Sequence, residues 1–174
     1  MAAPFLLALQ FALSLLAYAT FALWFVRPWL QTTPRATALA ILVFPQTFRF
    51  VGLTLLVPGV VGPGLPEAFA RSTAIGDTVT TALAWLSLIA LRAGWRLAIP
   101  AVWVFNLVGL ADLLMNLGRG VRLQVAYQLG AMWFVPAFIV PGMLVIHVLI
   151  FVCLVRGQPR AVPGAPDRRS LVDQ

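Results

Sequence analysis

The stretch that decides the fold spans residues 131–155 and reads AMWFVPAFIVPGMLVIHVLIFVCLV. Its 25 residues include no charged side chain. A bilayer core about 30 Å thick is crossed by a helix of about 20 apolar residues, so this run predicts a membrane-spanning helix. A transmembrane strand would need only about ten residues of alternating polarity, and the run does not alternate. The sequence therefore predicts a helical membrane protein.

Four further apolar runs of similar length precede it, at residues 5–26, 37–57, 74–91 and 97–117. Across the chain 61% of residues are hydrophobic and 10% are charged, whereas soluble domains average about 45–50% and about 25%. The mean hydropathy is +0.96. We therefore expect an all-α integral membrane protein in which residues 1–156 form a bundle of five transmembrane helices. The Pro-, Gly- and Arg-rich residues 157–174 are predicted to be a disordered cytoplasmic tail.

The first apolar run is open to two interpretations. Residues 17–19, Ala-Tyr-Ala, follow a Leu-rich stretch and resemble the cleavage region of a secretory signal peptide. However, no arginine precedes the run, and its hydrophobicity continues unbroken through Phe25 and Val26. We therefore favour an uncleaved helix.

The arginines predict the orientation. All twelve basic residues are Arg, and eight follow the first, third or fifth span: Arg27, Arg35, Arg92, Arg96, Arg156, Arg160, Arg168 and Arg169. Three, Arg71, Arg119 and Arg122, lie beyond the span ends on the other side, with Arg119 expected in a loop. Since cytoplasmic segments carry the excess of basic residues, the N-terminus is predicted outside and the C-terminus in the cytoplasm. We expect a multi-pass protein of the cell membrane, by preference the bacterial inner membrane.

The same arginines indicate the partner. They sit close to span ends, where anionic lipid headgroups lie. They do not form the clustered basic surface that binds nucleic acid. Membrane lipid is therefore an expected partner, and nucleic acid is not.

Seven polar side chains lie inside the predicted spans: Gln46, Arg49, Asp77, Asn106, Asp112, Asn116 and His147. A charge near mid-membrane costs about 2.5–3.5 kcal/mol on insertion scales, so such residues usually face the bundle interior and pair. At a rise of about 1.5 Å per residue, Arg49 lies about 12 Å, Asp112 about 7 Å and Asp77 about 5 Å from the outer end of its span. They are thus predicted to form one network in the outer half of the membrane. This network either holds the helices in register or binds an anion, a proton or a polar headgroup.

Other polar or irregular positions have two interpretations each. Pro136 and Pro141 interrupt the fifth span and free backbone carbonyls, as in the broken helices of transporters, although proline is also ordinary in membrane helices. His147 is predicted to be a hydrogen-bonded core residue, with haem ligation or a proton relay as the alternative. No lysine is present, and His147 and Cys153 are the only residues of their kinds. Schiff-base chemistry, a zinc cluster and an intrachain disulfide are therefore excluded.

Residues 48–92 resemble the DoxX-like membrane family. The pattern is Arg49 three residues before Gly52, an apolar run to Pro58-Gly59, then Leu65-Pro66, Gly76-Asp77 and Leu91-Arg92. The chain departs from the family in having Asp77 where Glu is usual and in lacking the Lys that often follows the first helix. The resemblance implies a four-helix core made of spans two to five, preceded by one extra helix. It also implies site roles for Arg49 and Asp77 and association with quinone-linked redox complexes or with other membrane proteins.

The expected function is that of an accessory or scaffold subunit of a membrane assembly. A redox- or quinone-linked assembly is the one that the resemblance implies, and no cofactor is required by the sequence itself. The alternative is a small oligomeric transporter or channel for a proton, an anion or a small polar solute. An intramembrane enzyme with Asp77 or Asp112 as acid/base and Arg49 holding a headgroup is disfavoured, because no catalytic motif is present.

Overall fold

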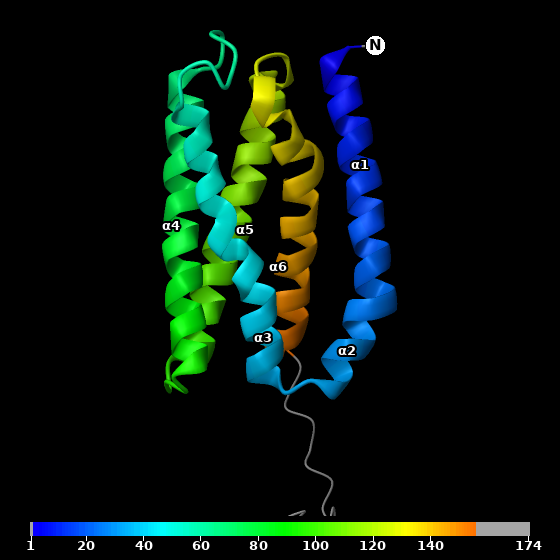
Figure 1. Ribbon diagram of the computed structural model, residues 1–174, viewed down its shortest axis with the longest axis vertical. Helices are drawn as coiled ribbons and strands as arrows, with labels where there is room; N and C mark the ends of the chain where they lie inside the picture. The colour runs from blue at the N-terminus through cyan, green and yellow to red at the C-terminus, as the bar shows by residue number, and fades with distance from the viewer. Residues whose placement is uncertain (1, 156–174) are drawn as a thin grey trace, which may run out of the picture.

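The computed structural model describes residues 2–155, and all the regular structure in that range is helical. Five long helical spans run side by side (Figure 1): Ala3–Thr32, Arg35–Leu56, Glu67–Arg92, Ala98–Arg122 and Gly130–Val155. Each is long and apolar enough to cross a membrane, as the sequence predicted. The tail expected over residues 157–174 lies outside the described residues.

Three of the spans are made of successive segments with different helical geometry. The first joins α1 (Ala3–Phe21), a π-helical turn η1 (Ala22–Val26) and α2 (Arg27–Thr32). The second joins α3 (Arg35–Val43) to the 3₁₀ helix η2 (Phe44–Leu56). The third and fourth are the continuous helices α4 (Glu67–Arg92) and α5 (Ala98–Arg122). After the short turn η3 (Val125–Tyr127), the fifth span combines η4 (Gly130–Trp133), η5 (Val135–Ile139) and α6 (Val140–Val155).

Prolines accompany the irregular segments. Pro28 is the second residue after the π-helical turn η1, Pro45 lies in the first turn of η2, and Pro136 lies in the π-helical turn η5. Proline lacks the N–H that would bond the carbonyl four residues earlier, so the backbone there is free to form wider or tighter turns. Pro141 is buried in the first turn of α6, so both prolines singled out in the fifth span lie where its helical geometry changes.

The first span packs on the outside of the other four. Only 6% of its most apolar window is buried, against 33–44% for the other spans. It lies along α6 and η5 at one edge of the bundle, with α4 at the opposite edge (Figure 1). The apolar core forms between α3, α4, α5 and α6, and its fully buried side chains include Leu39, Val102, Phe105 and Ile150.

Short connections set the two ends of the bundle. The loop of residues 57–66 and the loop around η3 lie at the same end of the bundle as the start of α1. The α4–α5 turn lies at the other end (Figure 1). At that second end Arg35 donates hydrogen bonds to the carbonyl oxygens of Cys153 and Leu154, which ties the start of α3 to the end of α6. Arg119, expected in a loop, lies instead in the last turn of α5, because that helix continues to Arg122.

Candidate functional site

The 3₁₀ helix η2 presents a line of residues to the bundle interior. Gln46, Arg49, Gly52 and Leu55 are all buried and recur every three residues. A 3₁₀ helix has 3.0 residues per turn, so residues spaced by three stack directly above one another. In an α-helix the same four positions would drift around the axis. The local geometry of η2 therefore aims Gln46 and Arg49 into the same interior column.

Arg49 binds side chains or backbone of two other helices. Its Nε donates to Asp77 Oδ1 at 2.8 Å, and its Nη1 donates to the carbonyl oxygen of Gly109 at 2.9 Å. Its Nη2 lies 2.7 Å from the same Asp77 oxygen and also pairs with Asp112 Oδ2. The Arg49 side chain is 3% exposed. One guanidinium thus connects η2, α4 and α5 in the interior of the bundle.

Hydrogen bonds extend this network toward the loop end of the bundle. Asn116 Nδ2 donates to Asp112 Oδ1 at 3.0 Å, and Thr73 Oγ1 donates to Asn116 Oδ1 at 3.1 Å. We call Arg49, Asp77, Asp112 and Asn116 the Arg49 cluster. The structure brings these four sequence-predicted residues into direct contact, and it adds Thr73, which the sequence analysis did not single out.

Three glycines make room for the cluster. A Cβ atom on Gly52 would overlap the Asp77 carboxylate, and one on Gly76 would overlap the Asp112 carboxylate. A Cβ on Gly109 would lie 2.8 Å from His147 Cε1 and 3.2 Å from Arg49 Nη1. Sequence analysis missed Gly109, although its position three residues before Asp112 mirrors that of Gly52 three residues after Arg49. Each helix of the cluster therefore supplies one charged side chain and one position without a side chain.

A second polar pair lies next to the cluster. Asn106 Nδ2 donates to the backbone carbonyl of His147 at 3.2 Å, and His147 Nδ1 lies 2.7 Å from Asn106 Oδ1. Because the amide oxygen can only accept, Nδ1 carries the proton and Nε2 of the neutral ring is left as an acceptor. His147 is fully buried, so its geometry is that of a core histidine held by Asn106.

Three interior polar atoms have no hydrogen-bond partner in the part of the chain that the structure describes: Gln46 Oε1, Ser87 Oγ and His147 Nε2. Gln46 uses its other amide atom, Nε2, to donate to the carbonyl of Met143 at 3.2 Å. Unpaired buried polar atoms are rare and usually mark a missing water, ion or function. Within residues 2–155 no group of His, Cys, Asp and Glu could hold a metal ion.

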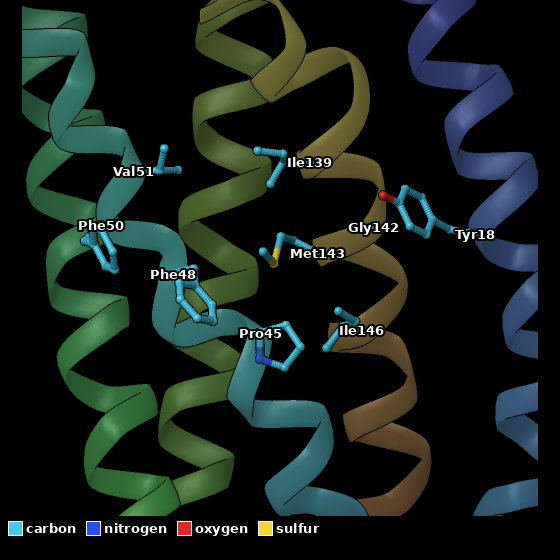
Figure 2. A pocket seen from close by; sticks show the side chains of 9 residues that line it. All are labelled: Tyr18, Pro45, Phe48, Phe50, Val51, Ile139, Gly142, Met143 and Ile146. Carbon is cyan, nitrogen blue, oxygen red and sulfur yellow. The ribbon is translucent and has the colours of Figure 1, made fainter.

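An apolar groove of about 470 Å³ lies between η2 and the fifth span, with Tyr18 of the first span at its side (Figure 2). Its walls come from α1, η2 and the fifth span, and they are Tyr18, Pro45, Phe48, Phe50, Val51, Ile139, Gly142, Met143 and Ile146. The Tyr18 ring packs on Gly142, where a Cβ would lie 2.9 Å from the ring carbon Cζ. The groove lies beside the polar interior, with Pro45 and Met143 next to the Gln46 amide.

Comparison with known proteins places this architecture in a family. The model described as "Domain of unknown function (DUF8737)" matches residues 6–155. The chain belongs to this family. No curated protein and no solved structure matches it. The part of the DUF8737 protein that matches contains every residue of the Arg49 cluster and all three glycines around it.

Replacing Arg49 tests whether the cluster stabilises the DUF8737 protein. We expect Arg49→Leu to cost about 3–5 kcal/mol, because it leaves two buried carboxylates without their cation. Arg49→Lys should recover only part of this loss, since a single ammonium cannot reach Asp77, Asp112 and the Gly109 carbonyl together. Thermal unfolding in one detergent measures both changes.

The matched control for that experiment is Arg71→Leu. Arg71 is 70% exposed and has only a 3.5 Å pair with Glu67, so its loss should change stability by less than about 0.5 kcal/mol. Arg119 is unsuitable as a control because it donates to Ser72 Oγ at 2.6 Å and lies over the Phe69 ring. Equal melting shifts for the Arg49 and Arg71 variants would contradict a stabilising cluster.

The close approach at Gly109 makes a second prediction. Gly109→Ala should destabilise the DUF8737 protein by about 1–3 kcal/mol, because the added methyl group meets His147 and Thr80 at 2.8 Å. Gly118→Ala, in the same helix, meets nothing within 4 Å and should be neutral or stabilising, since Ala favours helix by about 1 kcal/mol over Gly. The two melting temperatures, measured side by side, check this. Similar behaviour of both variants would show that α5 does not pack this closely.

Proposed function

We propose that this protein is a non-enzymatic accessory or scaffold subunit of a membrane assembly. The observation that carries the proposal is the internal use of Arg49: each of its three guanidinium nitrogens is bonded to Asp77, Asp112 or the Gly109 carbonyl. An arginine that binds a substrate anion or a headgroup must direct N–H groups toward it. Here those groups hold three helices of the same chain together, which supports a structural role for the cluster.

The proposal includes a cell-membrane location with the N-terminus outside, by preference in a bacterial inner membrane. Arg27, Arg35, Arg92 and Arg96 all lie at the end of the bundle opposite residue 2. Four more arginines, Arg156, Arg160, Arg168 and Arg169, follow α6 in the sequence. The excess of arginine there supports a cytoplasmic assignment for it.

We also propose a relationship to the DoxX-like proteins, with a quinone-linked redox assembly as the partner. In its support, Arg49 and Asp77, on which that resemblance rests, are in direct contact. The lateral groove between the first span and η2 adds an apolar surface at which a lipophilic molecule or a partner helix could dock.

A small oligomeric transporter is the second candidate. The observation that favours it is that η2, α4 and α6 each carry one interior polar atom without a partner among residues 2–155, namely Gln46 Oε1, Ser87 Oγ and His147 Nε2. A solute path needs polar walls, and the groove between η2 and the fifth span is lined by apolar side chains, which argues against its use as such a path.

Gentle extraction followed by native mass spectrometry and absorption spectroscopy tests the first proposal. We expect the full chain to retain a second polypeptide, a quinone or both. A homo-oligomer that carries only ordinary lipid would contradict the accessory role. In that case flux across liposomes, compared between the wild type and Arg49→Gln, would test transport, with Arg71→Gln as the matched control.

A further inference from the structure

The Arg49 cluster holds one more acid than base. Arg49 contributes +1, and Asp77 and Asp112 contribute −2, so the formal sum is −1 with all three ionised. η2, α4 and α5 each supply one of these charges, and the facing group from α6 is His147. Its Nδ1 bonds to Asn106, and its buried Nε2 has no acceptor among the described residues, which favours the neutral ring. A net charge in the interior of a membrane bundle is costly unless it is compensated. One additional positive charge would therefore make the cluster neutral.

The hydrogen bonds identify the atom that lacks a partner. Asp77 Oδ1 accepts from Arg49, Asp112 Oδ2 pairs with Arg49, and Asp112 Oδ1 accepts from Asn116. The remaining carboxylate oxygen, Asp77 Oδ2, receives none of the hydrogen bonds found within residues 2–155 and lies against Gly52. It is not one of the fully buried unpaired atoms, because the Asp77 side chain is 15% exposed. An ionised carboxylate is an acceptor only and gains from donors at both oxygens. A carboxylic acid carries its own proton at the second oxygen, and at this partly exposed position the O–H group can donate to solvent.

We propose that the cluster is a proton-binding site, in which the two carboxylates together bind one proton, at Asp77 Oδ2. The step is simple: an O–H bond forms on a carboxylate, no electron is transferred, and the cluster becomes neutral. The Asp77 and Asp112 side chains are 15% and 12% exposed, which gives the proton access from the surface. This inference goes beyond an accessory role, because it assigns the cluster a ligand.

A separate observation supports proton chemistry at this place. His147 is fully buried, and its Nε2 has no partner among the described residues. The His147 ring approaches the cluster at Gly109, since a Cβ on that glycine would lie 2.8 Å from His147 Cε1 and 3.2 Å from Arg49 Nη1. The His147 ring, with its unpaired Nε2, and the Arg49 guanidinium thus pack around the same glycine.

The geometry favours a proton over a metal ion. Hard cations take about six or more oxygen ligands, whereas one carboxylate oxygen of the cluster is left without a donor. Gly52 packs so close to that oxygen that even a Cβ would overlap it. A proton needs one oxygen and no additional space.

Variants that change the number of charges in the cluster test the proposal through their melting temperatures. Asp77→Asn and Asp112→Asn should each melt within roughly 3 °C of the wild type, because each leaves Arg49 with one carboxylate and a neutral cluster. The double variant should fall by roughly 10 °C or more, because Arg49 is then buried without an anion. Glu67→Gln is the control, since Glu67 is 81% exposed. Large additive losses in both single variants would overturn the proposal.

Infrared spectroscopy detects the proton directly and needs no substitution for the first measurement. At neutral pH the wild type should show the C=O stretching band of a carboxylic acid, which moves to lower frequency in D₂O. The band should disappear in Asp77→Asn or Asp112→Asn and persist in Glu67→Gln. Absence of the band from the wild type would overturn the proposal. A wild-type melting temperature that falls when sodium is replaced by choline would also overturn it, because the compensating charge would then be a metal cation.

Discussion

The structure depends on one guanidinium. Arg49 bonds to a carboxylate on α4, a carboxylate on α5 and a backbone carbonyl on α5. These groups lie largely inside the bundle, so any shift of one helix along its neighbours would separate buried charges from their partners. The hydrophobic effect drives helices into the bilayer but does not choose their depth relative to one another. In this bundle the Arg49 cluster supplies that choice.

The surrounding backbone is shaped to permit the interaction. The 3₁₀ geometry of η2 stacks Gln46, Arg49 and Gly52 on one line, so the arginine and the glycine that accommodates Asp77 face the same side. Gly76 and Gly109 do the same for Asp112 and for the Arg49 guanidinium. Small residues let membrane helices approach closely. Here the space they leave is filled by charged side chains of the neighbouring helix rather than by backbone.

The sequence predicts the five spans because hydrophobicity over about 20 residues is a property of each segment alone. It also indicates that Arg49, Asp77 and Asp112 should meet, because charges inside a membrane must find one another. It does not predict the 3₁₀ geometry of η2, the π-helical turns or the contacts of Gly109. Those features depend on which side chains the neighbouring helices bring to the same depth. The sequence likewise places Arg119 in a loop, because it does not show that α5 continues for another turn beside α4. In the structure this last turn brings Arg119 to Ser72.

The central claim is that the bundle interior needs a carboxylate because Arg49 is buried there, between Asp77 and Asp112. A double-mutant cycle tests it most directly. The free energy of unfolding lost on making Asp77→Asn and Asp112→Asn together is measured twice, once in the protein with Arg49 and once in the Arg49→Met variant. We predict that the pair costs about 3–5 kcal/mol beside Arg49 and at least about 2 kcal/mol less beside methionine, which needs no anion. Equal costs in the two backgrounds would show that Arg49 is not the residue on which the bundle depends.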